Sequence, residues 1–132
     1  MFNWDDAFSG GMQIVEVLTR TVRKEYLAYL RSKNISYIFA GENDLEPEHS
    51  LEKMKAYFGI HTLVLCGGAT INGVFLKAGM VVGICEVIVP HVEGNQDQQG
   101  IAETNVFVPD SFPLKKVTQL PNGGVHLVFE KK

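Results

Sequence analysis

The sequence predicts an α/β fold in which strands and helices alternate and an antiparallel hairpin closes the chain. β-type apolar runs alternate with helix-type stretches from residue 14 to residue 78. Asn122-Gly123, the strongest short hairpin signal, stands between two β-type runs near the C-terminus. With 132 residues, 45% of them hydrophobic, we expect a single domain over residues 13–132, preceded by an irregular lead-in over residues 1–12.

The first strand and helix are expected directly after that lead-in. Residues 14–18 are β-branched and apolar, which is typical of a buried strand. Residues 23–33 place their apolar side chains on one helical face, and Asn34 suits the left-handed end of such a helix. Residues 36–40 form the next strand. So short a connection predicts that the two strands run parallel.

A second strand–helix unit repeats this order. Pro47 suits the start of a helix over residues 47–57, and Gly59 suits its end. An apolar run at residues 62–65 is expected to be the central strand. A further helix is predicted over residues 69–78.

Gly67 and Gly68 join the expected central strand to that helix. A residue without Cβ lets a ligand lie against the backbone, and the N–H groups at a helix start attract a phosphate. A compact strand-to-helix turn explains the pair equally well, because the stretch is neither GxGxxG nor a P-loop with its lysine. The two interpretations stay open at this point.

The remaining elements are β-type. Residues 84–89 form a strand that Pro90 ends, and residues 94–100 are polar and predict a loop. Residues 114–120 and 125–129 are the two arms of the hairpin.

Composition and charge exclude several classes of function. The net charge of -3, without a cluster of Lys and Arg, argues against nucleic-acid binding. No apolar run is long enough to span a membrane and the N-terminus is acidic, so we expect a cytoplasmic protein. The histidines lack metal-ligand spacing, so no metal site is expected. Cys66 and Cys85 fall in β-type runs and are expected to be buried.

Several motifs resemble one known family. Residues 58–80, with the sequence FGIHTLVLCGGATINGVFLKAGM, combine a strand, Gly-Gly, a nearby Asn and an apolar helix. They resemble the reductase domain of bacterial riboflavin biosynthesis, the C-terminal domain of RibD, which belongs to the dihydrofolate-reductase-like superfamily. Residues 84–90 with Gly94, and residues 25–30 and 35–42 upstream, also agree with the family in order and spacing.

The resemblance implies a mixed, mostly parallel sheet flanked by helices, with the C-terminal hairpin antiparallel. It implies NADPH-dependent hydride transfer to a ribosylamino-pyrimidine or a related small heterocycle, and a homodimer. It assigns no catalytic residue. Residues carried over for the cofactor diphosphate are Gly67, Gly68, Ala69, Thr70, Ile71 and Asn72. Thr19 and Arg20 are placed at the 2′-phosphate, with Gly41 beside them at the end of the next strand.

The sequence also departs from the family pattern. Cys66 stands where the family usually has an acidic residue, and Val82-Gly83 stand where it has Asp-Glu. The family domain is longer and begins with a strand and helix, which we expect to be missing from this chain. Two alternatives to a reductase are therefore kept: a non-catalytic nucleotide-binding remnant or dimerisation module, and a purely structural partner that dimerises through its sheet edge.

Overall fold

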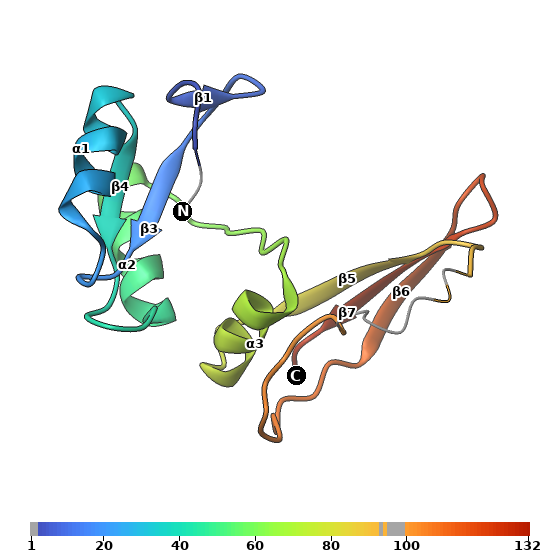
Figure 1. Cartoon of the computed structure of the whole chain (residues 1–132). Coiled ribbons are helices and arrows are strands. Elements are labelled where there is room, and N and C mark those ends of the chain that lie inside the picture. Colours follow the sequence, from blue (N-terminus) through green and yellow to red (C-terminus); the bar gives the residue numbers. More distant parts are fainter. Residues whose placement is uncertain (1–2, 93, 95–99) are drawn as a thin grey trace. The chain divides into compact units, whose positions relative to one another are not determined.

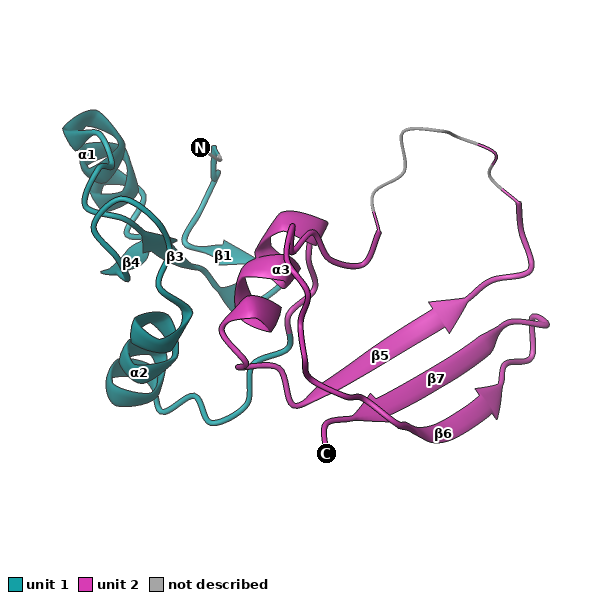
Figure 2. Cartoon of the chain, turned by 90° about the horizontal axis from the view of Figure 1, so that it is seen from below, with its two compact units in different colours: residues 1–64 teal, residues 65–132 magenta. Residues whose placement is uncertain are grey.

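Within residues 3–92, 94 and 100–132, the part that this computed structural model describes, the chain forms three helices and seven strands (Figure 1). Contacts divide it into two units, residues 1–64 and residues 65–132 (Figure 2). The expected single domain over residues 13–132 stays a prediction. Most of the expected loop at residues 94–100 lies outside the described residues.

The first unit contains the parallel strand pair that the sequence predicts. β3 (Val15–Leu18) and β4 (Ser36–Phe39) run parallel, with Val15 opposite Ser36 and Leu18 opposite Phe39. α1 (Lys24–Ser32) makes the crossover between them (Figure 1). The expected helix and both strands are confirmed.

Helix ends in this unit follow the predicted local signals. Asn34 adopts a φ of 55° just beyond α1, in the left-handed region. α2 (Pro47–Phe58) has Pro47 in its first turn and Gly59 at its C-cap, with a φ of 65°. Glycine suits that position because a side chain with Cβ disfavours the left-handed region.

The core of the first unit lies against α1. Its buried residues are Ala7, Tyr26, Leu30 and Ile35, and Trp4 packs beside them. Trp4 also donates a hydrogen bond from Nε1 to Oε1 of Glu16, 2.6 Å away. Ala7 and Trp4 therefore anchor the N-terminal lead-in to the first unit.

The prediction of an irregular lead-in over residues 1–12 is therefore wrong for the part that is described. β1 (Phe8–Ser9) and β2 (Met12–Gln13) form a short antiparallel hairpin. Gly10 and Gly11 take φ values of 57° and 80° in the turn, which glycine reaches without steric cost. The missed signal is a glycine pair between two very short extended pieces.

The expected central strand at residues 62–65 does not form. No described strand pairs with this segment, and Val64 is 77% exposed. An apolar β-type run becomes a strand only where a second strand satisfies its backbone groups, and sequence preference does not supply that partner. The mostly parallel sheet is likewise not confirmed, because the described strands form three small sheets and only β3–β4 is parallel.

The second unit contains an antiparallel sheet with the order β5-β7-β6 (Figure 2). β6 (Leu114–Gln119) and β7 (Val125–Glu130) are the predicted hairpin, and β5 (Gly83–Ile88) pairs with the other edge of β7. The N–H of Leu120 donates to the carbonyl of Gly124 at 2.8 Å, and Gly123 has a φ of 81°. The Asn-Gly turn is confirmed.

α3 (Ala69–Lys77) is the helix of the second unit. It confirms the helix predicted after the glycine pair, and it buries Ala69, Gly73 and Phe75. Lys131 donates from Nζ to the carbonyl of Gly79 beyond its C-terminal end, at 3.0 Å, and to Oδ2 of Asp110 at 2.7 Å. These bonds tie the end of α3 to the chain around β7.

Candidate functional site

The glycine turn before α3 is the centre of the candidate site. Gly68 is the N-cap of α3, and no side chain caps the helix. The first intrahelical bond runs from the N–H of Asn72 to the carbonyl of Gly68, at 3.1 Å. The N–H groups of the first turn therefore have no partner within the helix, as at any helix start.

The two glycines serve different purposes. Gly67 has a φ of 98°, and a Cβ there would stand 3.2 Å from Nδ2 of Asn72, so its backbone conformation requires glycine. Gly68 has a φ of −70°, and nothing lies within 4 Å of the position of its Cβ. The open space at Gly68 lets a ligand approach the backbone at the start of α3.

A segment that the sequence did not connect with this turn holds it in place. In the segment of residues 101–103, the N–H of Glu103 donates to the carbonyl of Ala69 at 2.9 Å, and Ile101 accepts a bond from Nδ2 of Asn72 at 2.7 Å. A Cβ on Gly73 would stand 1.9 Å from the carbonyl oxygen of Glu103. A glycine inside a predicted helix was the one signal of this close approach.

Thr70 and Asn72 are both engaged with this segment. Oγ1 of Thr70 donates to Oε2 of Glu103 at 3.1 Å. Oδ1 of Asn72 is buried and has no hydrogen-bond partner among the described residues. The predicted residues of this set thus form the glycine turn and the first four residues of α3. They are Gly67, Gly68, Ala69, Thr70, Ile71 and Asn72.

The other predicted residues, Thr19, Arg20 and Gly41, lie together in the first unit. The N–H of Arg20 donates to the carbonyl of Gly41 at 3.1 Å, where the C-terminal ends of β3 and β4 meet. Oγ1 of Thr19 lies 2.8 Å from Oγ1 of Thr21. Gly41 has a φ of 124°, and a Cβ there would stand 1.9 Å from the carbonyl oxygen of Asp44.

Arg20 has two contacts through its guanidinium. The group lies over the ring of Phe39, 4.5 Å from its centroid, and Nε is 4.0 Å from Oε1 of Glu42. Both charged side chains are more than half exposed, so the ion pair is weak and leaves Arg20 able to meet a second anion.

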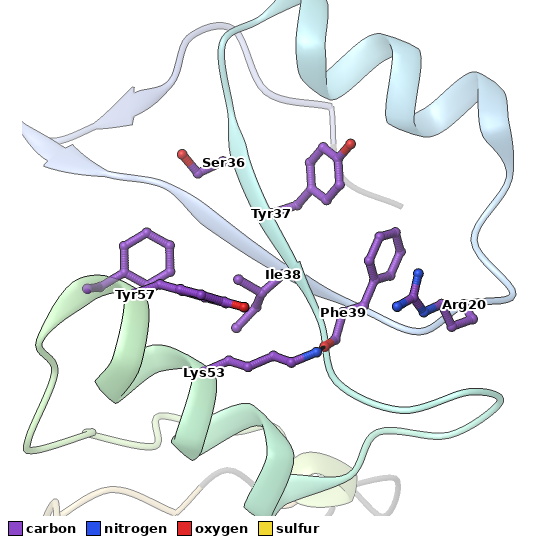
Figure 3. A pocket seen from close by; sticks show the side chains of 8 residues that line it. Arg20, Ser36, Tyr37, Ile38, Phe39, Lys53 and Tyr57 are labelled. Carbon is purple, nitrogen blue, oxygen red and sulfur yellow. Dashed lines mark hydrogen bonds between the residues drawn. The ribbon is translucent and has the colours of Figure 1, made fainter.

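Arg20 also borders an open hollow of about 480 Å³ in the first unit (Figure 3). β4 contributes residues from both of its faces, and α2 contributes Lys53, whose Nζ bonds the carbonyl oxygen of Phe39. The volume lies in the range of small-molecule sites. The lining residues are Arg20, Ser36, Tyr37, Ile38, Phe39, Lys53, Tyr57 and Phe58.

The two sets of predicted residues belong to different units, and their union in one site stays a prediction.

The expected burial of Cys66 and Cys85 is wrong, because both residues are exposed. Cys66 precedes the glycine turn outside any strand, and Cys85 lies on an uncovered part of β5. In the described part of the chain, no three metal-ligand side chains gather. Within the same residues, no helix is long and apolar enough to cross a membrane.

The chain is similar in fold to solved structures of two proteins. A pyrimidine reductase-like protein from Corynebacterium diphtheriae superposes with a TM-score of 0.75 and 13% identity, over 89% of this chain and 50% of that chain. RibD from Acinetobacter baumannii, in forms 2 and 1, gives TM-scores of 0.60 and 0.59 with 16% identity, over 89% of this chain and 37% of those chains. The fold of the chain is therefore similar to that of these proteins.

The family follows from the sequence as a whole. The RibD C-terminal domain profile matches residues 7–126, and the chain belongs to this family. The resemblance stated from the motifs is confirmed. The chain spans half or less of the length of the solved proteins that it matches. A comparison with curated proteins found no match.

Proposed function

We propose that the chain binds NADPH at the glycine turn before α3 and acts as a reductase of the riboflavin-biosynthesis type. The cofactor supplies a hydride, and the substrate is a ribosylamino-pyrimidine or a related small heterocycle. One observation carries the proposal: α3 begins uncapped, behind a glycine with open space around it, in a chain of the RibD C-terminal domain family.

The residues of the turn fit a diphosphate. N–H groups in the first turn of α3 can donate to phosphate oxygens, and the helix dipole favours negative charge at that end. Gly68 leaves the backbone accessible. The hydroxyl of Thr70 lies in the same turn, where its one O–H donates to Oε2 of Glu103. The share of the protein in hydride transfer is then to position the cofactor and substrate.

Arg20 and Thr19 fit the 2′-phosphate that distinguishes NADPH from NADH. A guanidinium offers a fork of donors to a dianion, and a neighbouring hydroxyl adds another. Their place at the ends of two parallel strands supports this role, because ligands of open α/β sheets bind at the carboxyl ends of strands.

Calorimetric titration tests the turn directly. We expect NADPH to bind the parent chain and not Gly68→Asp, because the added carboxylate fills the space at Gly68 and repels the diphosphate. A thermal melt of both forms controls for folding, since an Asp near a helix start is normally tolerated. If the parent shows no binding at about millimolar NADPH, or if Gly68→Asp binds equally well, the glycine pair is only a turn.

Selectivity for the 2′-phosphate tests Arg20. We expect Arg20→Ala to weaken NADPH binding about tenfold and to leave NADH binding nearly unchanged, since a charge-assisted bond contributes on this order. Lys24→Ala is the control, because it removes an exposed cation from the same unit. Equal losses for both cofactors would remove Arg20 from the 2′-phosphate site.

A second candidate function is NADPH binding without turnover. The segment at residues 62–65 lacks a strand partner among the described residues, and Cys66 replaces an acidic residue of the family pattern. Misplacing a substrate by about 1 Å can cost on the order of a hundredfold in rate. Oxidation of NADPH with the ribosylamino-pyrimidine at a rate typical of enzymes would reject this candidate. Retained NADPH binding without oxidation would reject the reductase.

We also propose that the chain forms a homodimer. The exposed apolar segment at residues 62–65 and the free edges of the small sheets leave backbone groups without ladder partners, and such edges favour pairing with another chain. Sedimentation at high protein concentration is expected to show a dimer or a larger species. A strictly monomeric profile would contradict this proposal.

A further inference from the structure

We propose that Glu103 sets the affinity of the α3 turn for anions, because its carboxylate accepts a hydrogen bond from Thr70 in the same helical turn that a diphosphate would use. This inference rests on the proposed cofactor site, for which it names a residue that opposes binding. Neither the resemblance nor the comparisons assign a role to Glu103.

The contacts of Glu103 place its carboxylate at the first turn of α3. Oε2 accepts a hydrogen bond from Oγ1 of Thr70, the second residue of the helix, at 3.1 Å. The backbone N–H of Glu103 donates to the carbonyl of Ala69, the first residue, at 2.9 Å. The acidic side chain therefore belongs to the same turn as the residues predicted to hold the diphosphate.

α3 itself supplies no negative charge at this end. It has no acidic residue in its first turn, and its N-cap is Gly68, which has no side chain to accept a bond. The carboxylate of Glu103, from outside the helix, therefore adds negative charge to the first turn through its bond with Thr70, without capping the helix N–H groups. A diphosphate arriving at the same turn meets a like charge and a hydroxyl that is already donating.

The backbone around Glu103 is fixed, whereas its side chain is exposed. Nδ2 of Asn72 bonds the carbonyl of Ile101 at 2.7 Å, and Gly73 lets the carbonyl of Glu103 approach α3 closely. The residue therefore stays beside the turn when a ligand binds. Its exposed side chain can leave Thr70 by a change of rotamer, which makes the opposition partial rather than absolute.

Glu103→Gln is the sharpest test because Gln keeps the shape and can still accept the bond from Thr70. Glu130→Gln is the matched control: it removes one charge from an exposed residue of the same unit, which pairs with Lys115 on β6. A thermal melt shows that each variant is folded. Glu103→Ala, which keeps the backbone bond to Ala69, replaces the Gln variant if that one does not fold.

Pyrophosphate and NADPH are each titrated into the parent and the two variants at low salt. We expect both ligands to bind Glu103→Gln about tenfold more tightly than the parent, and Glu130→Gln within about twofold of it. The gain is expected to shrink in about 0.5 M salt, because screening weakens repulsion between exposed charges.

The outcomes separate this inference from the proposed function. If the parent binds NADPH and Glu103→Gln binds it no better, or more weakly, the inference is overturned and the cofactor site stands. If Glu103→Gln gains pyrophosphate binding but no form binds NADPH, the inference stands and the cofactor assignment is overturned. If neither ligand binds any form, both are overturned.

Discussion

The two units of the chain use their apolar residues differently. Among the described residues, the first unit buries Ala7, Tyr26, Leu30, Ile35, Ile38 and Ala40. The described residues of the second unit include only two buried apolar side chains, Ala69 and Phe75, both on α3. Its strands leave large apolar side chains exposed, among them Val87, Ile88, Leu114 and Val117.

This difference follows from how each sheet is connected. Parallel strands need a crossover, and the crossover helix α1 brings its own apolar face to the strands that it joins. An antiparallel hairpin needs only a tight turn, such as that at Asn122-Gly123, so its ladder forms without a covering layer. Strand pairing in a fixed register can therefore form without a buried core. Among the described residues, the first unit has both, whereas the sheet of the second unit has paired strands with exposed apolar side chains.

The largest expected effect is at the core of the first unit. Leu30 is fully buried, so Leu30→Ala is expected to lower the free energy of unfolding by about 2–5 kcal/mol through lost burial and a cavity. Urea unfolding followed by the fluorescence of Trp4, the one tryptophan, measures it, because Trp4 packs against this core.

Ile88→Ala on β5 is the matched truncation in the second unit. Ile88 is 55% exposed, and its loss is expected to cost less than about 1 kcal/mol, measured by circular dichroism in urea. Equal costs for the two variants would show that the two units are packed alike.

An intermediate effect is expected at α3, the buried part of the second unit. Gly73→Ala raises helix propensity, but its Cβ would meet the carbonyl oxygen of Glu103 at 1.9 Å. We expect a net loss of about 1–3 kcal/mol in urea unfolding, as for other overpacked sites. Gly100→Ala, where the nearest atom is 4.0 Å away, serves as the control. A stabilised Gly73→Ala protein would mean that residues 101–103 do not pack on α3.

A smaller effect than at Gly73 is expected at Lys131. Its ammonium bonds Asp110 and the carbonyl of Gly79, and both charged side chains are mostly covered. Lys131→Met is expected to cost about 1 kcal/mol, since charge-assisted bonds at a protein surface contribute on this order. Thermal melts of the parent and the variant measure this cost. Lys132→Met changes the neighbouring exposed lysine and is expected to leave the melting temperature almost unchanged. Similar melting temperatures for the two variants would show that Lys131 does not hold the end of α3.

Sequence predicted the elements whose causes are local. Pro47, Gly59 and the Asn122-Gly123 turn mark ends that depend on a few neighbouring residues, and the structure has them at these positions. The strand expected at residues 62–65 failed because a strand also depends on a partner, which its own composition does not encode.

The sequence likewise indicated some residues of the candidate site and not others. The glycine turn and the ends of β3 and β4 follow from motifs, and the structure has each group of residues together within its own unit. Glu103 was not predictable, because it reaches Thr70 from 33 residues further along the chain, beyond a polar stretch without a pattern. Contacts of that kind depend on tertiary structure alone.

Amide hydrogen exchange with and without NADPH tests most directly the central claim that the glycine turn before α3 binds the cofactor. We expect slower exchange in the presence of NADPH at residues 68–72, with β6 and β7 unchanged as an internal control. Exchange at residues 19–21 and 41 of the first unit tests the 2′-phosphate assignment separately in the same samples. Unchanged exchange at residues 68–72 would contradict the central claim.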